Sequence, residues 1–266
     1  MEHFVWDASP EIFRIGPLAV RWYGLLFALG FIIGYELFQW FFKIEKRDPK
    51  DIDKLTIVMI IATVVGARLG HCFFYEPQYY LANPIEILMV WKGGLASHGA
   101  AIGILLGIWI FVLQNKQYKM MWILDRLVIA IALAGALIRL GNFFNSEILG
   151  VPSNSSFAII FAAVDQTPRH PVQLYESISY LLIFVYLLIE YNRKRAKLPS
   201  GRLFGAFLTL VFTARFILEY FKEFQTSLEN DMILRMGQVL SIPFILVGLY
   251  FWIKSYIPKR ELINKD

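Results

Sequence analysis

The 266-residue sequence has few charged residues and almost no cysteine. Charged residues make up 18% of the chain and hydrophobic residues 57%, whereas a soluble domain has about 25% charged and 45–50% apolar residues. The single cysteine, Cys72, excludes an intrachain disulfide and a zinc site built on cysteines. With a mean hydropathy of +0.53, the composition excludes a disordered chain and favours a protein embedded in a membrane.

Several motifs of soluble enzymes are also missing. The sequence has no glycine-rich nucleotide loop, no Ser-His-Asp order and no two-carboxylate signature. Its four histidines lack the HExxH type of spacing, so we expect no metal site. We find no internal repeat of about 20–50 residues and no duplicated half, which disfavours a secondary transporter.

Long apolar runs are abundant. A helix needs about 20 mostly apolar residues to cross the bilayer core. Seven segments meet this requirement, at roughly 18–42, 55–75, 94–113, 121–140, 172–191, 203–220 and 237–257. We therefore predict an all-α polytopic membrane protein that forms a single integral-membrane domain over residues 1–266. A small external loop or head region is expected at about 141–171, with a short strand or hairpin at 157–164.

The distribution of basic residues predicts the orientation. One set of alternate loops, with the C-terminal tail, holds 16 Lys and Arg residues, and the other set holds 5. Those 5 are Arg14, Lys92, Arg169, Lys222 and Arg235. Because cytoplasmic loops carry the excess of Lys and Arg, we predict that the N-terminus is outside and the C-terminus is cytoplasmic. The net charge of +5 then reflects topology, and we expect no nucleic-acid partner.

Five arginines lie within or at the ends of the predicted spans, where a central charge costs at least about 2.5 kcal/mol. They are Arg21, Arg68, Arg126, Arg139 and Arg215. Arg126 lies near a cytoplasmic end, so we expect its guanidinium to extend to the interface. The other four lie in the predicted outer half of the membrane. Every predicted span has at least one polar residue in that half. This clustering favours a convergent polar cavity over scattered anchoring of helix ends.

The span at 94–113 combines small residues with an ionisable one. Gly99, Gly103 and Gly107 recur every four residues, and they predict a face that lets a neighbouring helix approach closely. His98 precedes this face. A histidine at such a position is either a hydrogen-bonded interior residue or a catalyst, and the spacing alone leaves both open.

Two further clusters carry polar side chains near the outer ends of spans. Residues 139–150 hold four of them, of which a helix C-cap explains only one or two. Arg215 and Glu219 stand four residues apart on one helix face. They form either a neutral internal pair or a guanidinium oriented to receive a phosphate, and their spacing favours neither.

Six stretches of the sequence, in the right order, resemble the bacterial prolipoprotein diacylglyceryl transferase family. The longest runs from Arg139 to Glu147 and is followed by Gly150; the others are 21–24, 94–99, 169–176, 215–219 and 236–243. The family also has seven spans with the N-terminus outside. The chain departs from the family pattern at Ile138 and Ser146, which usually are glycines, and at Ala100, where a second glycine usually follows the histidine.

The resemblance implies a transferase at the outer leaflet of the bacterial cytoplasmic (inner) membrane. It would move the diacylglyceryl group of phosphatidylglycerol to the lipobox cysteine thiol of a prolipoprotein signal peptide and release glycerol phosphate. The implied partners are phosphatidylglycerol, these signal peptides and the membrane lipids, and no cofactor is implied. Because the substrate supplies the thiol, a single cysteine in the chain is sufficient.

The resemblance also assigns roles to individual residues. His98 or Tyr23 would accept the proton of the thiol, and Arg139 and Arg215 would hold the phosphate. Six further positions would bind or orient the substrate: Asn142, Asn145, Glu147, Gly150, Glu219 and Gln238. Among them, Asn142 and Glu147 would orient Arg139, Glu219 would orient Arg215, and Gly150 would allow a close approach of the chain.

Two functions of other classes stay open. A channel or transporter for an anionic solute would use an outer cluster of arginines, but it needs a continuous polar path that the inner halves of the spans hardly supply. A lipid-binding scaffold without catalysis would keep the arginines but would have no use for His98.

Overall fold

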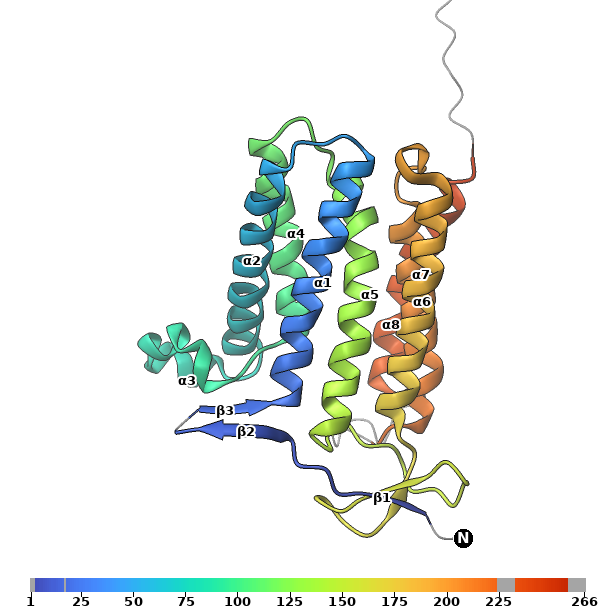
Figure 1. The fold of residues 1–266 in the computed structure, drawn as a ribbon. Helices are drawn as coiled ribbons and strands as arrows, with labels where there is room; N and C mark the ends of the chain where they lie inside the picture. The colour runs from blue at the N-terminus through green and yellow to red at the C-terminus, as the bar shows by residue number, and fades with distance from the viewer. Residues whose placement is uncertain (1–2, 17, 224–232, 258–266) are drawn as a thin grey trace, which may run out of the picture. The chain divides into compact units, whose positions relative to one another are not determined.

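The computed structural model describes residues 3–16, 18–223 and 233–257, and long helices dominate it (Figure 1). Seven of the described helices are long and apolar enough to cross a membrane. They are α1 (Trp22–Ile44), α2 (Lys50–Phe74), α4 (Ser97–Gln114), α5 (Met120–Phe144), α6 (Val172–Lys194), α7 (Arg202–Leu218) and α8 (Met236–Lys254). The all-α class and the seven predicted spans are therefore confirmed, whereas the orientation of the termini stays a prediction.

The chain forms two compact units that divide within helices α1 and α5. The first unit comprises residues up to Leu37 and from Leu124 onward, and the second comprises Phe38–Ile123. Tyr23, Arg139, Arg215 and the 141–171 region belong to the first unit, and His98 belongs to the second. Each unit is described by itself below.

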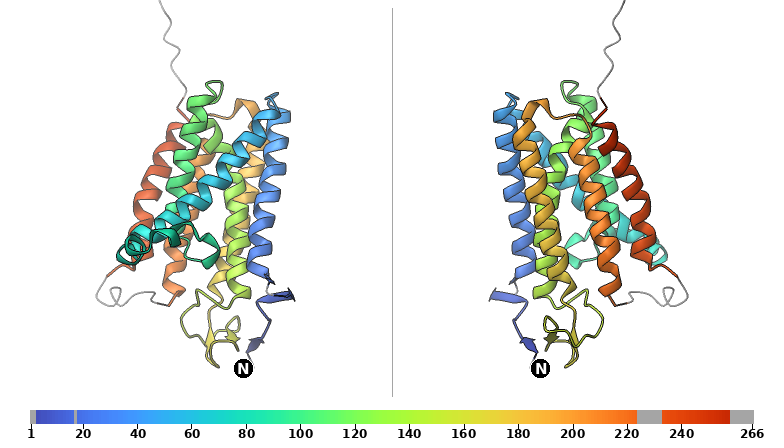
Figure 2. Two further views of the ribbon diagram at one scale, coloured as in Figure 1. Left: turned by 90° about the vertical axis from the view of Figure 1, so that its left-hand side faces the viewer. Right: turned by 90° about the vertical axis from the view of Figure 1, so that its right-hand side faces the viewer.

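In the first unit, α6, α7 and α8 run side by side (Figures 1 and 2). Helices α7 and α8 approach closely at two glycines: a Cβ on Gly205 would collide with the backbone nitrogen of Trp252 and would stand 2.7 Å from the carbonyl oxygen of Gly248. Helix α6 is joined to α5 by the Ser177 hydroxyl, which donates a hydrogen bond to the Ala136 carbonyl at 2.9 Å. Without a hydrophobic driving force between helices in lipid, such backbone approach and polar contact hold spans together.

Short strands accompany the helices of the first unit. The strand β1 (Phe4–Trp6) pairs in parallel with β4 (Ile159–Phe161), which pairs antiparallel with β5 (Pro168–Arg169). The ring of Trp6 lies 4.3 Å from that of Phe143, centroid to centroid, and closes a small core with Phe161. The predicted strand within 157–164 is confirmed. The N-terminal strand β1 and the hairpin of β2 (Glu11–Ile15) with β3 (Leu18–Arg21) were not predicted, because they are too short for a periodic signal.

The end of the first unit that carries the 192–202 loop is held by buried charges. The Asp125 carboxylate accepts hydrogen bonds from the backbone N–H groups of Gly201, Leu203 and Phe204 at 2.7–3.0 Å, which satisfies the first turn of α7. Arg126 is 2% exposed and its guanidinium lies 5.7 Å from the Tyr191 ring centroid. The expectation that Arg126 extends to the interface is therefore wrong: an aromatic face within the protein receives its charge.

The second unit is built on the contact of α2 with α4. A Cβ on Gly66 would stand 2.5 Å from the Gly99 carbonyl oxygen, and one on Gly70 would stand 2.6 Å from the Gly99 Cα. Gly103 and Gly107 continue this contact, so the predicted small-residue face is confirmed. Between the two helices the chain forms α3 (Pro77–Ala82) and the 3-10 turns η1 (Pro84–Leu88) and η2 (Val90–Lys92).

Candidate active site

In the first unit, Arg139 lies on the last turns of α5 and contacts α6. Its Nε is 2.9 Å from Oε2 of Glu176, which is fully buried, whereas the Arg139 side chain keeps 17% of its surface exposed. Arg139 also hydrogen-bonds the hydroxyl of Tyr180, one turn further along α6. The guanidinium is thus held from one side in a largely buried site, where an oriented cation attracts an anion strongly.

A short relay of amides and a carboxylate continues from Arg139. Its Nη1 donates to Oδ1 of Asn142 at 3.3 Å, and Nδ2 of Asn142 donates to Oε1 of Glu147 at 2.7 Å. Nδ2 of Asn145 donates to the same carboxylate oxygen at 3.2 Å. Four of the predicted site residues, including Arg139, are therefore brought into one hydrogen-bonded chain, in which the two amides fix the direction of the Glu147 carboxylate.

The backbone after α5 turns sharply to form this relay. Ser146 has φ +52°, in the left-handed region that glycine adopts without strain. This is one of the positions at which the family usually has glycine, so the departure places a side chain where a Cβ is disfavoured. Gly150 follows, and a Cβ there would collide with the carbonyl oxygen of His170.

A second cation, Lys222, lies beside Glu176. Its Nζ is 2.8 Å from Oε1 of Glu176 and 3.3 Å from Oε2 of Glu219, and the lysine side chain is 3% exposed. Gly237 leaves room for the Glu219 carboxylate, since a Cβ at that position would overlap it. Lys222 is also tied through its backbone, because it forms an isolated antiparallel bridge with Gly150.

The two residues predicted as an i, i+4 pair on α7 are not paired with each other. Among the described residues, no ion pair joins Arg215 to Glu219, which begins the 3-10 turn η4 (Glu219–Phe221) and contacts Lys222 instead. Arg215 is half-buried and lies within electrostatic range of the Tyr180 hydroxyl. The neutral-pair alternative is therefore wrong for this structure, and the charge of Arg215 acts on Tyr180 instead.

Two other predicted site residues, Tyr23 and Gln238, lie in different surroundings. Tyr23 is the second residue of α1, packs on Gly141 of α5, and has its hydroxyl within electrostatic range of Glu147 and Arg139. Gln238 is fully buried: its Nε2 donates to the Phe216 carbonyl at 3.2 Å and its Oε1 accepts from the Arg235 N–H at 3.0 Å. Its contacts connect the ends of α7 and α8, whereas Tyr23 lies beside the Arg139 relay.

The head region is fastened to the end of α7 by Arg169. Nη2 of Arg169 lies 2.6 Å from Oδ2 of Asp165, and Nη1 pairs with Glu223. The hydrogen bond from the Arg169 guanidinium holds the pKa of Asp165 below its usual value, and that carboxylate in turn raises the pKa of Arg169. Backbone hydrogen bonds from Val151 to Phe221 and from Glu223 to Leu149 complete the connection.

In the second unit, His98 is the second residue of α4 and its side chain is exposed. The imidazole lies against two aromatic rings from the end of α2, with centroids 5.2 Å from Phe74 and 5.7 Å from Tyr75. Within the part of the chain that the structure describes, these ring contacts are the interactions of the imidazole, and no hydrogen bond joins it to another residue. Its ring nitrogens therefore keep no partner within the described residues.

The segment that leads into α4 is organised by Arg68. The guanidinium donates to the carbonyls of Glu86, Ile87, Gly93 and Gly94, with distances of 2.5–3.3 Å, and lies 4.9 Å from the Tyr80 ring centroid. Arg68 was predicted as part of an outer polar cavity, but four backbone carbonyls take its donors. It therefore sets the path of the chain toward His98.

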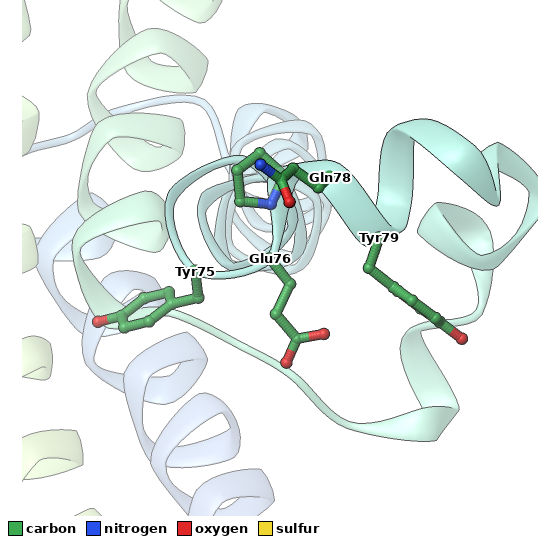
Figure 3. Close-up of a pocket in the computed structure, with 5 residues that line it drawn as sticks. Tyr75, Glu76, Gln78 and Tyr79 are labelled. Atoms are coloured by element: carbon green, nitrogen blue, oxygen red, sulfur yellow. The ribbon is translucent and has the colours of Figure 1, made fainter.

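A hollow of about 380 Å³ adjoins the end of α2 and is lined by residues 75–79. Figure 3 shows the Tyr75 and Tyr79 rings directed to opposite sides, with the Glu76 carboxylate between them. Tyr75 is thus shared between this hollow and the aromatic contact with His98.

Lys222 and Tyr180 were not among the residues singled out from the sequence. In the sequence, Lys222 is a basic residue in a predicted external loop, and Tyr180 is one of several aromatic residues in an apolar span. Their one available signal is spacing, since Lys222 follows Glu219 by three residues and Tyr180 follows Glu176 by four. Within the described ranges, no group of three or more His, Cys, Asp and Glu side chains could hold a metal ion.

Seven of the described helices are long and apolar enough to cross a membrane, and a largely buried arginine is paired with a buried carboxylate among them. These features define a polytopic membrane protein. The model of the family described as "Prolipoprotein diacylglyceryl transferase" matches residues 10–254. The chain belongs to this family and is a transferase.

Curated relatives agree with this assignment. The chain is 52% identical to the phosphatidylglycerol–prolipoprotein diacylglyceryl transferase of Tolumonas auensis, over 94% of this chain and 96% of the relative. It is 49% identical to the protein of that name from Chloroherpeton thalassium, over 95% and 94% of the two chains. Identity to the corresponding Bacteroides fragilis protein is 39%, over 92% and 93%.

Proposed function

We propose that the chain transfers the diacylglyceryl group of phosphatidylglycerol to the lipobox cysteine of a prolipoprotein signal peptide, at the outer leaflet of the bacterial cytoplasmic membrane. The observation that carries the proposal is the setting of Arg139. Nε of its guanidinium contacts the buried Glu176 and Nη1 donates to Asn142. The orientation of the guanidinium is therefore fixed before an anion binds. Preorganised cations of this kind stabilise a phosphate as it becomes a leaving group.

The reaction breaks the S–H bond of the thiol and one C–O bond of the lipid and forms one C–S bond, and the thiol proton finally leaves the base for the released glycerol phosphate or for water. His98 or Tyr23 takes the proton of the substrate thiol, and the sulfur attacks the glycerol carbon that carries the phosphate oxygen. The C–S bond forms as the C–O bond breaks, and the electron pair departs with the oxygen of glycerol phosphate. Arg139 and Arg215 receive the charge of this leaving group. Asn142, Asn145 and Glu147 keep Arg139 and the headgroup in position, and Gly150 admits the neighbouring chain.

The two remaining site assignments concern substrate contact at the same end of the first unit. Glu219 and Gln238 are proposed to border the headgroup, with Gln238 acting through the ends of α7 and α8 that it joins. The signal peptide brings the nucleophile, and the membrane lipids surround the apolar helices. No cofactor takes part in this scheme.

The test is a reconstituted transfer. The purified protein in detergent micelles is incubated with phosphatidylglycerol and a peptide that carries a lipobox cysteine. We expect a thioether-linked diacylglyceryl peptide by mass spectrometry, together with one glycerol phosphate per peptide. A peptide with serine in place of the cysteine is the matched control and should stay unmodified. Lipid binding without any peptide product would overturn the proposal in favour of a scaffold, and anion flux through vesicles without product would favour a channel.

A further inference from the structure

Lys222 lies between two acidic side chains of the first unit, Glu176 and Glu219. It is 3% exposed and its Nζ contacts both Glu176, at 2.8 Å, and Glu219, at 3.3 Å. Its backbone position is fixed by the bridge with Gly150. A lysine that is buried to this extent is costly unless its charge is compensated, so the pairing is a feature of the site and not a chance surface contact.

The carboxylates depend on cations for their compensation. Glu176 is fully buried, and among the described residues neither of its oxygens takes a well-aligned hydrogen bond. Within the described ranges its ion-pair partners are Arg139 and Lys222. If Lys222 were neutral, Arg139 alone would have to compensate Glu176, and Glu219 would lose the cation it contacts. Each carboxylate would then reduce the positive potential that an incoming anion meets.

We propose that Lys222 is a positioning residue for anion binding: by neutralising Glu176 and Glu219, it leaves the charge of Arg139 available to the phosphate of the lipid headgroup. This inference rests on the proposed function and adds to it a residue with no assigned role. Lys222 acts through Glu176 and does not itself touch the reacting atoms. In the group of Arg139, Glu176, Lys222 and Glu219 the charges balance, and the loss of Lys222 would leave one excess negative charge.

The experiment compares three variants of the full chain with the wild type. Lys222→Arg keeps the charge, Lys222→Met removes it with little change in length, and Lys222→Met with Glu219→Gln removes one charge of each sign. For each we would measure turnover, the KM for the lipobox peptide, the inhibition constant of glycerol phosphate, and the melting temperature. The inhibition constant reports anion binding directly and separates it from folding.

We expect Lys222→Met to weaken inhibition by glycerol phosphate about tenfold, the scale for one unit charge acting at short range in a partly buried site. Turnover should fall by a similar factor, while the KM for the peptide stays within about twofold. Lys222→Arg should remain within about threefold of the wild type. The double variant should recover most of the affinity for glycerol phosphate, because the charge balance is restored.

Three results would overturn the inference. They are unchanged glycerol phosphate inhibition in folded Lys222→Met, equal losses in Lys222→Arg and Lys222→Met, or a double variant that binds glycerol phosphate no better than Lys222→Met. The proposed function is judged separately, by whether the wild type forms the thioether. If the wild type forms no thioether, direct binding of glycerol phosphate to the wild type and the variants still tests the role of Lys222. A wild type that does not bind glycerol phosphate would overturn the inference about Lys222.

Discussion

Nε of Arg139 lies 2.9 Å from Oε2 of Glu176, a carboxylate with no exposed surface. The pair joins α5 to α6 and fixes the plane of the guanidinium. Breaking a buried ion pair by removing one partner leaves an uncompensated charge, which costs several kcal/mol. Loss of either partner should therefore destabilise the protein, and the contact leaves only the other edge of the Arg139 guanidinium for an anion.

Replacement of Arg139 by lysine should lower turnover by roughly 10²–10³, the scale for loss of one oriented charge-stabilising donor. Lysine keeps the charge, but it cannot contact Glu176 and a phosphate with separate edges of one rigid fork. Initial rates of thioether formation measure the effect. Arg193→Lys, at an exposed position near the end of α6, is the control and should be nearly silent. Equal, small effects at both positions would show that Arg139 does not hold the phosphate.

Cys72 should be dispensable for the chemistry, because the substrate supplies the thiol. The Cys72 side chain is free and has no exposed surface, so a covalent intermediate on it has no access to substrate. We expect Cys72→Ser to retain most of the activity per folded protein, and Cys72→Ala serves as a second variant that buries no hydroxyl. Loss of activity in both, with normal folding, would contradict direct displacement by the substrate thiol.

The glycine contact between α2 and α4 should be sensitive to a single methyl group. A Cβ on Gly66 would stand 2.5 Å from the Gly99 carbonyl oxygen, so Gly66→Ala forces the helices apart and should destabilise the protein by about 1–3 kcal/mol. Gly24→Ala is the matched control, since nothing lies within 4 Å of its Cβ position. Melting temperatures in detergent would decide. A similar melting temperature for both variants would mean that this contact does not support the fold.

The fastening of the head region should weaken in acid. The pKa of Asp165 is lowered by Arg169, so its contribution to stability is complete above the pKa of the unfolded chain and is lost as the pH falls through the lower folded value. We expect Asp165→Asn to melt below the wild type at neutral pH, with the difference vanishing at a pH below about 4. Melting curves of both proteins, recorded from neutral pH to below about pH 4, test this prediction. A difference that is independent of pH would exclude the Asp165 charge as its cause.

The orientation of the chain can be tested with reporter fusions. From the excess of Lys and Arg in one set of loops, a reporter inserted after Lys197 should be cytoplasmic and one inserted near Ser155 should be external. Paired alkaline phosphatase and fluorescent protein fusions give opposite readouts for the two sides. The reversed pattern would place the Arg139 site at the inner leaflet and contradict the proposed reaction.

Much of the architecture follows from the sequence alone, because a bilayer imposes simple rules. Backbone polar groups must be satisfied within each span, so length and hydropathy identify the seven helices without knowledge of their contacts. The four-residue spacing of glycines predicts the close face of α4, and the residues at 139–147 predict a polar cluster at the end of a span, whose contacts with Arg139 only the family resemblance implied. Each of these signals is local, and each is read within a single segment.

Tertiary structure decided which charges compensate one another. Arg215 and Glu219 have ideal spacing for a pair, yet Glu219 turns to Lys222 because α7 ends there and the 3-10 turn redirects its carboxylate. Arg126 is buried against Tyr191, and Arg68 binds the carbonyls of a distant turn. In a low-dielectric interior, a charge takes the partner that the packing of helices brings within reach, and spacing along the chain does not specify that partner.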